Sequence, residues 1–251
     1  MLSRTRASLL LSAALVIVGL TALSTPTLAR TLTPDAQRCE ADRIAPDQRI
    51  AAYTAVIAQG PDRGKDLAAD YGNRAVGWMA KKDLDRAQAD LDQAIKLDPN
   101  YTQAYYNRAN NARYKNDLDA AIADYSKALA LDAKYVPAYV NRGIVWSRKN
   151  DWNRAIADYT QALKIDKDDI IALYRRGQAY TAKGSHDLAI ADFDSAIKLD
   201  DTAEQLYFTR AQALLAKGDR ARGIADLRKA LSINPDYEDA AAALKQAESK
   251  S

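Results

Sequence analysis

The apolar positions of this chain follow a helical period within short segments, and the segments recur at a fixed interval. Ala121 to Leu129 reads AIADYSKAL, and related nine-residue segments begin at residues 87, 155, 189 and 223, so that successive copies are 34 residues apart. Hydrophobic side chains three and four positions apart share one face of a helix. A fixed period of this length is typical of stacked helical hairpins. The pattern therefore predicts an all-α solenoid.

The repeat frame divides most of the chain into units of two helices each. These units are residues 68–101, 102–135, 136–169, 170–203 and 204–237. A polar turn separates the two helices of each unit. Asn and Gly accept the left-handed conformation that ends a helix. One of them occupies the turn in every repeat except the first, which has Lys82. Residues 30–67 are expected to form a linker and a degenerate capping repeat, because terminal units have a neighbour on one side only. Residues 238–251 are expected to form a capping helix.

The first 29 residues have the pattern of a secretory signal peptide. Arg4 and Arg6 precede an apolar run from Leu9 to Leu23, and residues 27–29 offer small side chains for cleavage after Ala29. The run is short for a membrane span, which needs about 20 residues. We therefore expect an exported, periplasmic protein, and the alternative is a membrane anchor that is not cleaved.

Composition excludes several classes of function. The formal charge is +3, and removing the two arginines of the predicted signal peptide leaves +3 − 2 = +1. A near-neutral chain with interspersed charges lacks the basic footprint of a nucleic-acid-binding protein. One histidine, His186, and one cysteine, Cys39, cannot build a His/Cys zinc site. We expect no catalytic residues, no metal, no cofactor, no nucleic acid and no small-molecule substrate. Cys39 is expected to be buried in the N-terminal cap, or else to bond a second chain.

Small and bulky residues alternate in a fixed order within each repeat. Counting from the first residue of a repeat, positions 8, 20 and 27 are always Ala or Gly, and positions 4, 11 and 24 are mostly aromatic or Leu. In the third repeat, Tyr139, Gly143 and Trp146 are followed by Ala155 and Tyr159. This order resembles the tetratricopeptide repeat (TPR), whose signature is W-x2-L-G-x2-Y, then A-x3-F, then P. The resemblance covers residues 68–237 and implies antiparallel helix pairs, a right-handed superhelix and a protein or peptide partner.

One departure from the TPR pattern is systematic. Position 7, usually Leu in the family, is always Arg here, and position 23 is always Asp. We expect an Arg–Asp bridge between the two helices, within a repeat or between neighbours. The alternative is two separately solvated charges, since exposed ion pairs add little stability. The residues are Arg74, Arg108, Arg142, Arg176 and Arg210, with Asp90, Asp124, Asp158, Asp192 and Asp226.

The TPR resemblance also implies where a partner binds. In the family the first helix of each repeat lines a concave groove, and positions 2, 5, 6, 9, 12 and 13 face it. Position 6 is Asn in the first three repeats, and an amide can hydrogen-bond the backbone of an extended peptide. We therefore expect an asparagine ladder flanked by aromatic and amide side chains. The candidate groove residues are Asn73, Asn107, Asn141, Arg175, Tyr106, Tyr174, Asn110 and Gln178.

These observations predict an adaptor or scaffold of the cell envelope that holds an extended segment of a protein partner. Two alternatives are a module that self-associates through its end repeats and a non-catalytic subunit of an envelope or secretion complex. Some TPR proteins grip a terminal carboxylate with a Lys/Asn/Arg clamp. Tyr106 and Ile171 stand at its lysine positions. We therefore do not expect that clamp.

Overall fold

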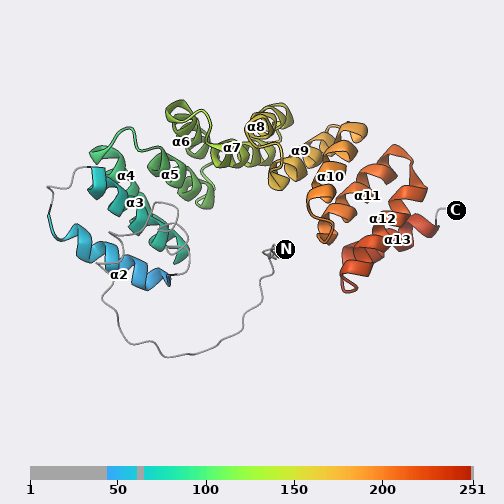
Figure 1. The fold of residues 1–251 in the computed structure, drawn as a ribbon, viewed down its shortest axis with the longest axis horizontal. Helices are drawn as coiled ribbons and strands as arrows, with labels where there is room; N and C mark the ends of the chain where they lie inside the picture. Colours follow the sequence, from blue (N-terminus) through green and yellow to red (C-terminus); the bar gives the residue numbers. More distant parts are fainter. Residues whose placement is uncertain (1–43, 61–64, 250–251) are drawn as a thin grey trace, which may run out of the picture. The chain divides into compact units, whose positions relative to one another are not determined.

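The computed structural model describes residues 44–60 and 65–249. This part of the chain is entirely helical, without strands, and the predicted all-α fold is confirmed (Figure 1). The helices are α2 (Pro46–Ile57), α3 (Lys65–Ala80), α4 (Leu84–Leu97), α5 (Thr102–Tyr114), α6 (Leu118–Leu131), α7 (Val136–Arg148), α8 (Trp152–Ile165), α9 (Ile170–Ala182), α10 (His186–Leu199), α11 (Glu204–Lys217), α12 (Arg220–Ile233) and α13 (Glu238–Ser249).

Consecutive helices pack in pairs, and the pairs stack in chain order. Each repeat holds one pair, from α3 with α4 to α11 with α12, and each second helix also packs on the first helix of the next repeat. The first helices α3, α5, α7, α9 and α11 contact one another across repeats, whereas successive second helices have at most sparse contacts. The surface formed by these five helices is called the first-helix face below.

The turn inside each repeat has one backbone geometry throughout. Its central residue has a positive φ in every case: Lys82 62°, Asn116 66°, Asn150 60°, Gly184 73° and Gly218 92°. In four of the repeats, the Asp directly before the second helix caps that helix. For example, the side chain of Asp117 accepts a hydrogen bond from the Ala120 amide at the start of α6. Lys82, the residue least suited to this conformation, adopts it with the others.

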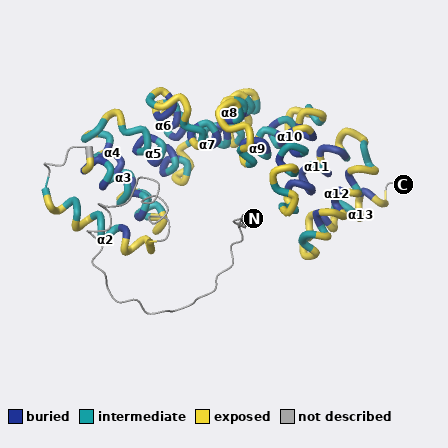
Figure 2. Tube along the Cα trace, in the orientation of Figure 1, coloured by how far each residue is buried: buried dark blue, intermediate teal, exposed yellow. Residues whose placement is uncertain are grey.

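The core is distributed along the array, since buried positions run from α3 to α13 (Figure 2). Glycine at position 8 is required where an aromatic ring lies on it. A Cβ on Gly143 would lie 2.6 Å from Cε1 of Tyr159, whose hydroxyl is 3.2 Å from Oγ of Ser147. In the second repeat Tyr125 instead donates to Oδ1 of Asn110 at 2.5 Å, and position 8 is alanine. The direction in which the tyrosine ring points thus determines whether position 8 must be glycine or can be alanine.

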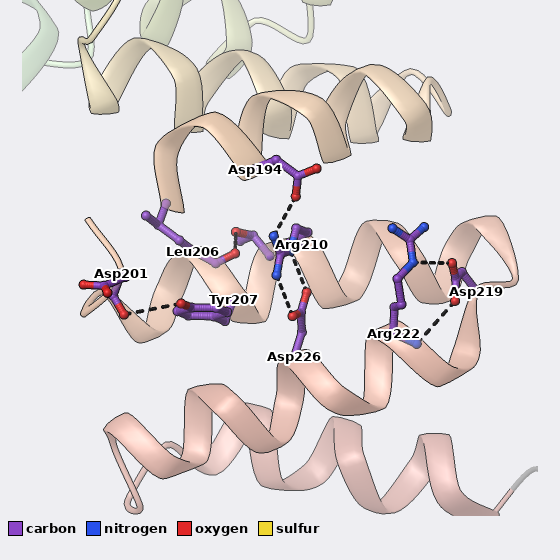
Figure 3. Close-up of polar contacts among 9 residues, drawn as sticks. Asp194, Asp201, Leu206, Tyr207, Arg210, Asp219, Arg222 and Asp226 are labelled. Atoms are coloured by element: carbon purple, nitrogen blue, oxygen red, sulfur yellow. Dashed lines mark hydrogen bonds and ion pairs between the residues drawn. The ribbon is translucent and has the colours of Figure 1, made fainter. Parts of the chain in front are cut away.

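The predicted Arg–Asp bridge is confirmed, and it lies within each repeat. Arg210 donates from Nε and Nη2 to both carboxylate oxygens of Asp226, at 2.7 Å each (Figure 3). Its Nη1 reaches Asp194 of the preceding repeat at 2.6 Å. The other four arginines repeat this geometry, with Thr54, Asp92, Ser126 and Thr160 as the acceptors from the preceding unit. One side chain per repeat therefore joins three helices.

The two ends of the array resemble its interior. Arg74 donates to Thr54 of α2 and Lys81 pairs with Asp47 of α2, which are the contacts that second helices make elsewhere in the array. At the other end α13 packs on α12, and Arg220 donates to the Ala247 carbonyl at 2.7 Å. The predicted signal peptide and Cys39 lie outside the described residues.

Candidate protein-binding face

Three of the predicted groove residues meet between α5 and α7. Asn141 donates from Nδ2 to Oη of Tyr106 at 2.8 Å and to Oδ1 of Asn110 at 3.3 Å. The same Asn110 oxygen accepts the hydroxyl of Tyr125. The Asn141 amide therefore links two repeats across the first-helix face, and its donors already have partners in this structure.

The other two asparagines of the predicted ladder lie in different surroundings. Asn107 is only 7% exposed, and its Oδ1 accepts from Nε2 of Gln103 at 3.2 Å. Oε1 of Gln103 in turn accepts from Tyr135 at 2.7 Å. Asn73 is half-buried and makes no side-chain hydrogen bond to a described residue. The three amides are thus equivalent in sequence but not in environment.

The remaining predicted residues form a cluster on α9. Arg175 is exposed, its Nη1 donates to Oε1 of Gln178 at 3.1 Å, and its guanidinium lies 5.5 Å from the ring centroid of Tyr174. Gln178 donates to the Tyr174 hydroxyl at 2.9 Å. This cluster presents a cation supported by an amide and a ring, which suits an anionic group.

Two further arginines on the first helices were not among the predicted site residues. Arg148 donates from Nη2 to Oδ1 of Asn116 at 2.7 Å and from Nη1 to the Arg113 carbonyl at 3.5 Å. Arg113 lies 5.0 Å from the ring centroid of Tyr114, which is 60% exposed. Both arginines stand at groove-facing positions of the TPR pattern, so a search of positions 12 and 13 for charge would have found them.

The charge of the first-helix face differs from that of the helix interfaces. At the interfaces the arginines of position 7 all bind carboxylates, and Lys81, Lys115, Lys149 and Lys217 also pair with Asp of the preceding unit. Within the described residues Arg113, Arg148 and Arg175 make no ion pair. Three successive repeats therefore offer cations whose charge is not neutralised by any carboxylate of the described residues.

Two tyrosines behind this face have altered acidities. Burial raises the pKa of Tyr125 above its ordinary value, and the nearby charge of Arg113 opposes the shift. Burial also raises the pKa of Tyr159 to about 12, against smaller opposing effects from Ser147 and Arg175. Both side chains stay neutral at physiological pH, so they act as packing and hydrogen-bonding groups.

Within the described residues there is no cluster of three or more His, Cys, Asp or Glu placed to hold a metal ion. Over the same ranges, no helix has the length and apolarity to cross a bilayer.

Family models match the chain over much of its length. The model described as TPR repeat matches residues 109–148 and 147–184, and two models described as tetratricopeptide repeat match residues 170–202 and residues 79–101 with 204–237. The chain belongs to the tetratricopeptide-repeat family. The resemblance inferred from the order of small and bulky residues is therefore confirmed, and the TPR fold supports an adaptor or scaffold role in protein interaction. No curated protein matches the sequence.

Solved structures with the same fold include other TPR proteins. The crystal structure of YrrB, described as a TPR protein with an unusual peptide-binding site, is 25% identical, with a TM-score of 0.66 over 77% of this chain and 98% of YrrB. MamA is 23% identical, with a TM-score of 0.61 over 65% of this chain and 94% of MamA. A TPR protein from Parabacteroides merdae is 19% identical, with a TM-score of 0.63 over 84% of this chain and 89% of its own. The last two likenesses concern the fold alone.

Proposed function

We propose that this TPR protein is an adaptor or scaffold that holds an extended, acidic segment of a protein partner along its first-helix face. The observation that carries the proposal is the set of three arginines, Arg113, Arg148 and Arg175, on first helices of successive repeats without an ion-pair partner in the described residues. Positive charges on a surface attract a partner of complementary charge and disfavour a partner of like charge.

The spacing of the array supports an extended partner. Packed helices of neighbouring repeats lie about 10 Å apart. Three residues of extended chain cover about 10 Å at roughly 3.3 Å per residue. An extended segment with an acidic side chain at every third residue therefore meets one repeat per acidic residue. The neighbouring tyrosines supply contact area at low entropic cost, as Tyr114 and Tyr174 do beside their arginines.

Peptide binding by a relative agrees with this proposal. YrrB, at 25% identity, is described as having a peptide-binding site, although an unusual one. The asparagine ladder expected from the sequence enters this proposal only in part. Asn141 already bonds Tyr106, and Asn107 lies in the wall of the face, so the arginines and the exposed rings carry most of the recognition.

The proposal includes export. Residues 1–29 have the signal-peptide pattern, and the mature protein would begin at Arg30 and act in the periplasm. The partner is then an envelope protein. Measuring the N-terminus of protein purified from the producing cells tests this point. A chain that still begins at Met1 would contradict it.

Photo-crosslinking tests the binding face. Ile171 on α9 is 58% exposed, and Leu188 on α10 is 52% exposed. A photoreactive residue at 171 is expected to capture partner segments in cells, and the same residue at 188 is the matched control on a second helix. Mass spectrometry should place the captured segments in extended, acid-rich sequence. Equal capture from both positions, or capture that persists in Arg148→Gln/Arg175→Gln, would contradict the proposed face.

A further inference from the structure

The second repeat contains a cavity that none of the groove residues lines. Its volume is about 420 Å³, within the range of small-molecule sites, and it opens between α4, α5 and α6. Its walls are formed by Gln88, Arg108, Ala112, Lys115, Asp117 and Ala120, among others.

The other repeats show what fills the equivalent space. In the first repeat Trp78 stands at the position of Ala112, and the Arg86 guanidinium lies 4.7 Å from its ring centroid. In the third repeat Trp146 and Arg154 make the same contact at 4.6 Å. The second repeat has Ala112 and Ala120 at these two positions. The cavity is therefore the space of a stacked indole and guanidinium.

The carboxylate of Asp117, at the edge of this space, lacks the arginine partner that equivalent carboxylates have in other repeats. Where position 19 is arginine, it pairs with the Asp that caps the second helix, as Arg154 does with Asp151 at 3.3 Å and Arg222 with Asp219 at 2.6 Å (Figure 3). Asp117 caps α6 through the Ala120 amide but makes no ion pair within the described residues. Asp117 is therefore a negative charge beside the position that an arginine occupies in the third and fifth repeats.

The surrounding side chains are held in place and do not fill the space. Arg108 binds Asp124 at 2.7 Å and Asp92 at 2.7 Å, and Lys115 binds Asp85 at 2.6 Å. The base of the same junction is polar. Asn111 is fully buried and donates to Oε1 of Gln88 at 3.1 Å, while its own Oδ1 lacks a partner in the described residues.

We propose that this cavity binds a planar aromatic group that carries a positive charge. The ring takes the place of the missing indole between Ala112 and Ala120, and the cation takes the place of the missing guanidinium beside Asp117. The site is distinct from the first-helix face, because none of the groove residues named above lines it.

Tryptamine is the first probe, because it joins an indole to an ammonium group. In a ¹H–¹⁵N NMR titration we expect it to shift the amides of Ala112 and Ala120. Indole, which has no charge, should bind more weakly, and indole-3-acetate, with a negative charge, should bind most weakly. Ala112→Trp restores the residue found in the first and third repeats and should weaken tryptamine binding at least about tenfold. Gln161→Trp on exposed α8 surface is the control and should leave it unchanged.

Charge variants test the ionic half of the proposal. Ala120→Arg supplies the missing guanidinium, and Asp117→Asn keeps a good helix cap while removing the charge. Each should abolish the preference for tryptamine over indole. A blocked peptide containing Trp-Arg distinguishes the sources of the group: tighter binding than tryptamine assigns the site to a protein partner, and weaker binding to a free aromatic amine. Absence of shifts at Ala112 and Ala120, or unchanged affinity in Ala112→Trp, would overturn the proposal.

Discussion

Arg142 and Asp158 form a two-point ion pair between the helices of the third repeat. Nε donates to Oδ2 at 2.8 Å and Nη2 to Oδ1 at 2.7 Å, and the Asp158 side chain is only 8% exposed. Nη1 of the same arginine donates to Ser126 of the preceding repeat at 2.8 Å. This hydrogen-bonded contact raises the pKa of Arg142, against the opposing effect of its burial, so its charge is fixed.

Asp158→Ala should destabilise the fold by about 2–4 kcal/mol, because it leaves a largely buried guanidinium without its counter-charge. Asp168→Ala is the matched control, since Asp168 lies exposed in the following loop. Chemical denaturation of both variants measures the difference. Equal unfolding free energies would show that the pair contributes no more than two solvated charges.

Gly143→Ala should destabilise by roughly 1–3 kcal/mol, although alanine is the better helix former, because its Cβ would overlap the Tyr159 ring. The second repeat suggests a partial rescue, since there the ring turns toward Asn110 over an alanine. Ile144 stands at the position of Asn110. A double-mutant cycle of Gly143→Ala with Ile144→Asn should therefore show favourable coupling. A stabilising Gly143→Ala would contradict the packing described here.

Lys82→Gly should stabilise the protein by about 1 kcal/mol, because Lys82 has a φ of 62° that glycine adopts without steric cost. Ala80→Gly, two residues earlier at the end of α3, should destabilise it instead. Thermal unfolding of the two variants separates the effect of the turn from the general effect of glycine. A loss of stability in both would argue against strain at Lys82.

The raised pKa of Tyr159 should make the folded protein less stable in alkali. Its pKa is raised from 10.0 to about 12 by burial, so its contribution is fully present below pH 10 and is lost as the pH rises through 12. The shift corresponds to roughly 3 kcal/mol. Tyr159→Phe should therefore flatten the fall in stability between pH 10 and 12. Tyr114→Phe, at an exposed ring, should leave the profile unchanged.

The sequence predicted the fold and one of its main contacts. The 34-residue period requires equivalent helices, and a charge pair kept in every copy requires a common partner, so the Arg–Asp bridge was expected. The third contact of each arginine, from Nη1 to a side chain of the preceding unit, was not expected. The acceptors are Thr54, Asp92, Ser126, Thr160 and Asp194, which all offer a side-chain oxygen but differ in residue type.

The candidate site was less predictable, because neighbouring repeats differ at single positions. Asn107 and Asn141 are equivalent in the repeat frame. Gln103 and Tyr135 stand beside the first, whereas Tyr106 and Asn110 stand beside the second. These neighbours are not periodic, so the exposure of each amide depends on contacts that the repeat pattern does not encode. Arg113, Arg148 and Arg175 likewise occupy three different repeat positions. The fold was needed to show that none of the three makes an ion pair with another described residue.

The central claim is that unpaired arginines on the first-helix face bind an acidic extended segment. The most direct measurement is fluorescence anisotropy with a labelled 12-residue peptide (about four repeat spacings) that has Asp or Glu at every third position. Arg148→Gln/Arg175→Gln should weaken its binding at least about fivefold, and added salt should reduce the difference. Lys164→Gln/Lys198→Gln removes the same charge from exposed positions of α8 and α10 and should leave affinity unchanged. Equal losses in the two double variants, or no loss in either, would contradict the claim.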